Sequence, residues 1–143
     1  LSISIGYPPL SAESAVLRQG GGHTKLDQLT PLFSVDTWRH FKAQVPKVEV
    51  DESLIDYMLS VVTLTRSHPA LRLGVSTRGA LAWKRAAQAF AFIRGRSYVT
   101  PDDLKTLAYP VLNHRFWLHR GGGGRGEKSR LIDEFLSETP IPR

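Results

Sequence analysis

An arginine stands at the point where a helix should begin. In the stretch GVSTRGALAWKRAAQ, Ser76 is a good N-cap and an Ala-rich apolar run follows, so Arg78 falls in the first turn. That turn already carries unpaired N–H donors and the positive end of the helix dipole, which disfavour a cation by about 0.3–1 kcal/mol. A phosphate group beside the turn would make the same position favourable. Arg78 is therefore the candidate phosphate ligand, with a solvent-exposed arginine as the alternative.

Other residue patterns that could do chemistry do not complete a site. The stretch GGGGRGEKS resembles a phosphate-binding loop, but Glu127 separates Gly126 from Lys128 and no strand precedes it. His114 and His119 are five residues apart, so they do not share a helical face as a metal-binding pair would. There is no nucleophile elbow, and a chain without cysteine has no thiolate ligand or nucleophile. The sequence predicts neither a metal site nor a catalytic centre.

The composition is that of one ordinary globular domain. The chain has 143 residues, of which 41% are hydrophobic and 22% charged, a balance that supports a core. No run of about eighteen apolar residues occurs, so no membrane span is expected. The lack of cysteine fits a reducing compartment, and the expected location is cytoplasmic. The net charge of +6 comes from scattered basic residues, which favours a solvated surface over a nucleic-acid footprint. The chain begins without Met, so we expect a piece of a longer protein.

Helical periodicity predicts an all-α bundle preceded by a short strand. The alternation in residues 2–5 and the stop at Gly6 indicate a strand and turn, whose sheet we expect in sequence upstream. The predicted helices cover residues 12–19, 35–45, 52–68, 77–94, 101–109 and 127–138. Their predicted N-caps, where the signal is clear, are Ser11, Ser34, Asp51, Ser76 and Thr100. Pro110 is expected to end its helix, and helix-end positions explain Asp102 and Asp103 without catalysis.

The helix over residues 77–94 is expected to lie at the centre of the bundle. Its apolar positions are Ala82, Trp83, Ala86, Ala87, Ala89, Phe90 and Ile93, and its polar side is marked by Lys84, Arg85 and Gln88. We expect Trp83 and Phe90 in the core, so Phe90→Ala should cost about 3–5 kcal/mol. The apolar face of the helix over residues 52–68 is assigned to Leu54, Ile55, Met58, Leu59, Val62 and Leu64.

Residues 74–115 resemble part of the C-terminal lid of MoxR-type AAA+ ATPases. That family has a small-Ser-Pro-Arg-Ala helix start, an Ala-rich helix, a Gly-Arg-x-Tyr-Val-x-Pro-Asp-Asp segment and a Val-Leu-x-His-Arg element. The stretch LGVSTRGALAWKRAAQAFAFIRGRSYVTPDDLKTLAYPVLNHR has them in this order, with Thr77 in place of the proline. The leader SISIGYP resembles the family's last core strand. The resemblance implies three parts: the end of the ATPase core over 1–22, a helical lid over 23–120, and a Gly-rich link with a C-terminal helix over 121–143.

The resemblance also implies what the longer protein does. The arginine of the family's Ser-Pro-Arg motif is the sensor 2 residue, which reaches the γ-phosphate of ATP in the core and maps onto Arg78. Ile5, Gly6 and Tyr7 map onto the hinge that covers the adenine base. The implied parent is a chaperone-like ATPase that uses ATP and Mg²⁺, forms a homo-oligomeric ring, with six subunits expected, and acts with a von Willebrand factor A-type partner. The nucleotide-binding motifs of the core are not in this sequence. We therefore expect the chain alone to be inactive and to bind no cofactor tightly.

Two alternatives remain at this stage. The first is a basic helical module that binds nucleic acid, with Lys84 and Arg85 on the exposed face of the central helix. Its binding would weaken strongly with salt. The second is a structural oligomerisation domain in which Arg78 makes an ion pair.

Overall fold

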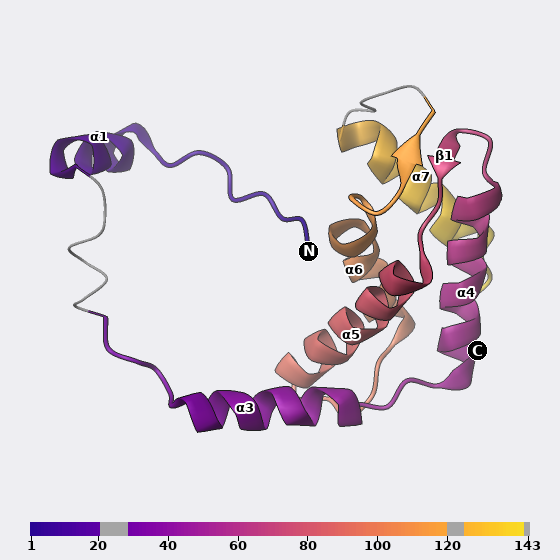
Figure 1. Cartoon of the computed structure of the whole chain (residues 1–143), viewed down its shortest axis with the longest axis horizontal. Helices are drawn as coiled ribbons and strands as arrows, with labels where there is room; N and C mark the ends of the chain where they lie inside the picture. The colour runs from indigo at the N-terminus through magenta and orange to yellow at the C-terminus, as the bar shows by residue number, and fades with distance from the viewer. Residues whose placement is uncertain (21–28, 120–124, 142–143) are drawn as a thin grey trace.

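The described residues form a helical bundle, as the sequence predicts, and in addition one small β-ribbon. The computed structural model describes residues 1–20, 29–119 and 125–141. The helices are α1 (Leu10–Gln19), α3 (Val35–Gln44), the 3-10 turn η1 (Val45–Lys47), α4 (Glu52–Ser67), α5 (Thr77–Ile93), α6 (Pro101–Leu112) and α7 (Arg125–Glu138). Figure 1 shows α4 to α7 packed together, α3 near the C-terminal end of α5, and α1 apart from the bundle. The predicted glycine-rich link at 121–124 lies outside the described residues.

The core is built around α5 and α6. Trp83 of α5 and Leu104 of α6 are both fully buried, and the indole Nε1 of Trp83 donates to the Leu104 carbonyl at 2.9 Å. From α4, Val61 and Val62 join this core, and Phe135 joins it from α7. Burying a large apolar side chain contributes about 1.5–3 kcal/mol, so these contacts hold the four helices together.

Local start signals work as predicted at four helices. The side-chain oxygens of the four N-caps accept hydrogen bonds from backbone N–H groups of the first turn; these caps are Ser34, Asp51, Ser76 and Thr100. Thr100 also makes the reciprocal bond of a capping box, in which its backbone N–H donates to the Asp103 carboxylate. Gly95 ends α5 with a φ of +72°, the left-handed conformation that glycine adopts without strain. These interactions are local in sequence, which is why the sequence reveals them.

The N-terminal region departs from the prediction in two respects. Residues 1–9 carry no strand, and we attribute this to the lack of a neighbouring strand among the described residues. Ser11 does not cap the first helix, because α1 already begins at Leu10 with Pro9 as the N-cap residue and without a side-chain cap. Ser11 therefore lies inside the first turn.

The prediction that Pro110 ends its helix is wrong. Pro110 lies inside α6, which continues to Leu112. A proline in a helix interior removes a hydrogen bond and can cost about 3 kcal/mol. The two residues that follow, Val111 and Leu112, are each only 1% exposed. Their burial favours the helical continuation past Pro110 by an amount comparable to the cost of the proline.

A two-stranded antiparallel ribbon was not predicted. The strands are β1 (Leu71–Leu73) and β2 (Trp117–Leu118), with Leu71 opposite Leu118. Strands of three and two residues are too short to show an alternating pattern. The ribbon joins the chain before α5 to the chain after α6, so it closes the bundle at the end where α5 begins (Figure 1).

Two predicted helix faces need correction. On α5, Gln88 is only 7% exposed, because its Nε2 donates to the carbonyls of Val48 and Pro46, whereas Ile93 is 80% exposed. Phe90 is only partly buried and has the Arg94 guanidinium over its ring, so it is not a core residue. On α4, Leu59 is half-exposed, while Tyr57, Val61 and Thr65 are buried. The partners of these residues lie far away in sequence, so periodicity alone misplaced the faces.

Candidate functional site

Arg78 lies in the first turn of α5, as predicted. Ser76 caps the helix, its Oγ accepting from the Gly79 amide at 3.2 Å, and Arg78 is the second residue of the helix. Its side chain is exposed. Among the residues that the structure describes, Arg78 forms neither a side-chain hydrogen bond nor an ion pair. The guanidinium is therefore free to meet a ligand, and its role as a phosphate ligand stays a prediction.

The segment before Arg78 is fixed to α4 by two side chains. The Thr65 hydroxyl accepts from the Val75 amide at 2.9 Å and donates to the Val62 carbonyl at 2.6 Å. Arg66 Nε donates to the Val75 carbonyl at 2.9 Å. Both polar groups of the Val75 backbone are thus bonded to α4, and this sets where α5 begins. The sequence reading missed Thr65 and Arg66, because nothing in their local pattern shows a contact ten residues away.

Two glycines allow this close packing. A Cβ on Gly74 would stand 2.6 Å from both the Cα of Arg66 and the carbonyl oxygen of Thr65, which no side chain could tolerate. A Cβ on Gly79 would stand 2.6 Å from Cγ1 of the buried Val75, and 3.4 Å from Cδ of Arg115. Glycine at these positions lets α4 and the stem of Arg115 lie directly against the start of α5.

Arg96, which follows the C-terminal end of α5, has a structural role. Arg96 binds Asp103 through two hydrogen bonds, of 2.8 and 2.6 Å, and also donates to the Tyr98 carbonyl. Burial alone would raise the pKa of Asp103, but hydrogen bonds from Arg96 and Thr100 outweigh it and hold that pKa below its ordinary value. The bond to Asp103 in turn raises the pKa of Arg96. Asp103 therefore secures the start of α6, in agreement with its predicted helix-end role.

Comparisons with known proteins identify the domain. Residues 63–130 match the family model of the AAA lid domain. The chain is 29% identical to chaperone MoxR1 of Mycobacterium tuberculosis over 150 residues, which span 99% of this chain and 37% of the relative. It is 38% identical over 74 residues to protein MoxR of Paracoccus denitrificans, covering 50% and 22% of the two chains. The chain carries an AAA lid domain of the MoxR type.

Two further relatives also match almost the whole chain. The chain is 33% identical to the uncharacterised protein YeaC of Bacillus subtilis over 141 residues, 98% of this chain and 44% of the relative. A crystal structure from Cytophaga hutchinsonii, provisionally described as an ATPase, superposes with a TM-score of 0.79 at 28% identity, covering 97% of this chain and 45% of that one. The chain thus spans less than half the length of these relatives. The expected helical lid fold is confirmed.

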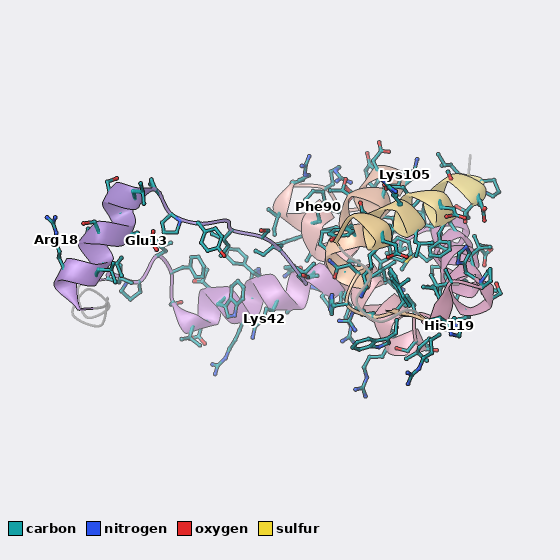
Figure 2. The ribbon with its side chains drawn as sticks, turned by 90° about the horizontal axis from the view of Figure 1, so that it is seen from above. Glu13, Arg18, Lys42, Phe90, Lys105 and His119 are labelled. Atoms are coloured by element: carbon teal, nitrogen blue, oxygen red, sulfur yellow. The ribbon has the colours of Figure 1, made fainter. Side chains whose placement is uncertain are left out.

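The residues predicted to form the hinge lie apart from the buried core of the bundle. Ile5 and Tyr7 are 93% and 98% exposed, and Gly6 adopts a φ of +77°. The backbone hydrogen bond that ties this leader to the bundle runs from the Ser2 amide to the Pro110 carbonyl, at 2.7 Å. Figure 2 shows Glu13 and Arg18 of α1 well away from Phe90, Lys105 and His119 of the bundle. No hydrogen bond among the described residues joins residues 1–9 to Arg78. The role of Ile5, Gly6 and Tyr7 at the adenine base stays a prediction.

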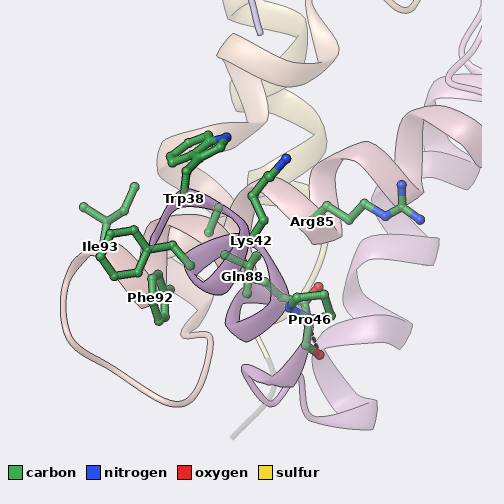
Figure 3. A pocket seen from close by; sticks show the side chains of 10 residues that line it. Trp38, Lys42, Pro46, Arg85, Gln88, Phe92 and Ile93 are labelled. Atoms are coloured by element: carbon green, nitrogen blue, oxygen red, sulfur yellow. Dashed lines mark hydrogen bonds between the residues drawn. The ribbon is translucent and has the colours of Figure 1, made fainter. Parts of the chain in front are cut away.

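An apolar cavity of about 670 Å³ lies between α3 and α5 of the lid. Trp38 and Phe41 line it from α3, and Phe92 and Ile93 from α5. Figure 3 shows Arg85 at its rim with the guanidinium directed away from the aromatic rings. The nucleic-acid alternative places Arg85 on a binding face. The structure places the aliphatic part of this side chain beside the apolar cavity.

The part of the chain that the structure describes contains neither a cluster of metal ligands nor a helix that could span a membrane. No three of its histidine, aspartate and glutamate side chains come together as a metal site would require. His68 instead lies edge-on to the Phe135 ring, with Nε2 3.5 Å from a Glu134 carboxylate oxygen. No helix within the described ranges combines the length and apolar character that a bilayer crossing needs.

Proposed function

We propose that this chain is the lid portion of a larger MoxR-type AAA+ ATPase with chaperone-like activity, and that Arg78 is its sensor 2 residue. In this role the guanidinium reaches the γ-phosphate of ATP held, with Mg²⁺, by the ATPase core. One observation carries the proposal: Arg78 is exposed and without an ion pair within the described chain, on a helix whose start is rigidly fixed. A fixed helix start can hold an arginine in one place for a phosphate in the core.

The exposure of residues 1–20 supports a proposed division of the chain. Leu1, Ile3, Leu10 and Leu17 are each more than two-thirds exposed, although their side chains are large and apolar. Such a group is typical of a surface covered by another part of the protein. We place the end of the ATPase core at residues 1–22, the lid at 23–120, and the C-terminal helix with its link at 121–143. The core then covers the leader, and Ile5, Gly6 and Tyr7 lie at the hinge beside the adenine base.

The proposal extends to assembly and partners. The longer protein is expected to form a homo-oligomeric ring, with six subunits, in which the lid packs between neighbours, and to act in the cytoplasm with a von Willebrand factor A-type partner. The chain alone should neither hydrolyse ATP nor bind it tightly enough for turnover. Sedimentation of the longer protein with and without ATP tests the ring, and a nucleotide-dependent assembly near six subunits is the expected result.

The experiment for Arg78 uses the longer protein that contains this lid. We compare the wild type with Arg78→Ala and Arg78→Lys, and measure ATP affinity and ATP turnover on each. Arg130→Ala is the matched control, because Arg130 is exposed on α7 and forms no side-chain bond among the described residues. We expect slow turnover with retained ATP binding in both Arg78 variants, and normal turnover in Arg130→Ala. Normal turnover in Arg78→Ala would remove this residue from the nucleotide site, and salt-sensitive nucleic-acid binding would become the next test.

A further inference from the structure

A pocket beside the start of α5 is lined by arginines from three separate elements. Arg66 comes from α4, Arg72 from β1 and Arg115 from the turn after α6. The remaining lining is the backbone and side chains of residues 73–77, and the cavity measures about 540 Å³. No carboxylate lines it, and Arg78 is not among its lining residues. We call these residues the three-arginine pocket.

Two of the three side chains are held in place by backbone carbonyls. Arg66 Nε donates to the Val75 carbonyl at 2.9 Å, and Arg115 Nε donates to the Val111 carbonyl at 3.0 Å. The Arg115 stem also lies at van der Waals distance from the position of a Gly79 Cβ. A guanidinium has five N–H donors, so each bond through Nε leaves both terminal amino groups for other acceptors. The cost of ordering these two long side chains is thus met by the fold before any ligand binds.

The three charges have no counter-ion in the described part of the chain. Its ion pairs join Arg39 with Asp36, His68 with Glu134, and Arg96 with Asp103, and none includes an arginine of the pocket. Gathering like charges around one cavity raises the free energy of the empty state. An anion would relieve this repulsion and would also accept the unused guanidinium N–H groups.

We propose that the three-arginine pocket binds a phosphate-type oxyanion, separately from Arg78. A phosphate presents several oxygens around one centre and can accept from more than one guanidinium fork at once, whereas a carboxylate has two oxygens and suits a single fork. The cavity volume is in the range of small-molecule sites and is large enough for linked phosphates. The ligand class is therefore a phosphate chain, carried by a nucleotide or free in solution. The inference does not rest on Arg78 being a sensor residue.

Arg72 gives the cleanest test. Its guanidinium forms no hydrogen bond to the described protein, so Arg72→Ala should leave the fold intact, unlike substitution of Arg66 or Arg115. The probe is pyrophosphate, titrated into the 143-residue chain by calorimetry at constant ionic strength, with sodium chloride making up the difference. We expect one site, whose Kd rises at least tenfold in Arg72→Ala. Arg130→Ala removes the same charge elsewhere and should leave the Kd unchanged within about twofold, and Arg78→Ala is measured beside it to locate the anion.

The outcomes separate the pocket from its neighbours. No pyrophosphate binding, or an equal loss in Arg72→Ala and Arg130→Ala, would overturn the proposal, since the latter reports only general charge. A loss in Arg78→Ala but not in Arg72→Ala would also overturn it and would assign the anion to the first turn of α5. ATP and adenosine identify the source of the phosphate: tighter binding of ATP than of pyrophosphate indicates a nucleotide, and equal binding indicates a free phosphate chain. A failure of the pyrophosphate test leaves the turnover test of Arg78 unaffected. Normal turnover in the Arg78 variants likewise leaves the proposal for the three-arginine pocket standing.

Discussion

At the residue scale, two arginines near α5 have opposite surroundings. Arg96 is bound by two hydrogen bonds to a buried carboxylate, and its charge serves the packing of α5 against α6. Arg78 has the same charge but no partner in the described chain, in a first turn that disfavours cations. Of these two arginines, Arg78 is therefore the one whose charge is available for a ligand. This contrast is the physical basis for proposing Arg78, rather than Arg96, as the nucleotide ligand.

The lowered pKa of Asp103 predicts acid sensitivity. A carboxyl whose pKa is lower in the folded than in the unfolded chain stabilises the fold above its unfolded pKa, near pH 4. That contribution is lost as the pH falls through the folded value. We expect Asp103→Asn to be less stable than the wild type at neutral pH, and the difference to shrink as the pH falls below about 4. Urea denaturation across this pH range measures it.

Asp102→Asn is the matched control for this prediction. Asp102 is exposed in the same turn, and its carboxylate forms no hydrogen bond or ion pair in the described residues. A stability difference for Asp103→Asn that stays constant with pH, or an equal pH dependence in Asp102→Asn, would contradict the assignment.

At the element scale, the start of α5 is set by its contact with α4 rather than by its own sequence alone. Ser76 provides the cap, but Thr65, Arg66 and Gly74 fix the backbone just before it. The cap could be predicted, because N-cap chemistry spans three residues. The contact with α4 could not, because it joins residues about ten positions apart through a close approach that only the folded chain shows.

Gly74→Ala should test this contact. The added Cβ would meet backbone atoms of Thr65 and Arg66 at 2.6 Å, and backbone cannot move aside as a flexible side chain can. We expect a loss of at least about 1–3 kcal/mol in the free energy of unfolding, measured by urea denaturation. Gly126→Ala is the control of opposite sign: its Cβ would meet nothing within 4 Å, so helix propensity should leave stability unchanged or raise it by up to about 1 kcal/mol. Equal effects of the two substitutions would show that the close approach is not needed.

The faces of α5 give a second prediction at this scale. Trp83 is fully buried and its indole donates to Leu104, so Trp83→Ala should cost about 3–5 kcal/mol. Phe90 is partly exposed, and Phe90→Ala should cost clearly less than Trp83→Ala. Chemical denaturation of the two variants side by side checks the order. A larger loss for Phe90→Ala would restore the face that periodicity alone suggests.

At the scale of the whole molecule, the helices of the lid are held together by contacts between residues that lie far apart in the sequence. The β1–β2 ribbon joins the two sides of the α5–α6 pair. Lys128 of α7 donates to the carbonyls of Asn113 and Phe116 at 2.8 and 3.3 Å, and Phe135 is buried against the core. The all-α class and the order of the helices follow from local patterns in the sequence. The ribbon, the helical Pro110 and the three-arginine pocket do not, because each depends on residues that meet only in the folded bundle.

The most direct test of the central proposal is ATP turnover by the longer protein with Arg78 replaced by alanine, measured at saturating ATP. If Arg78 contacts the γ-phosphate, turnover should fall about tenfold or more, with ATP affinity changed far less, since losing a charge-assisted contact costs about 1.5–3 kcal/mol. Wild-type turnover in this variant would contradict the account: the chain would keep its place as a MoxR-type lid, but the exposed arginine at the start of α5 would have no part in the use of ATP.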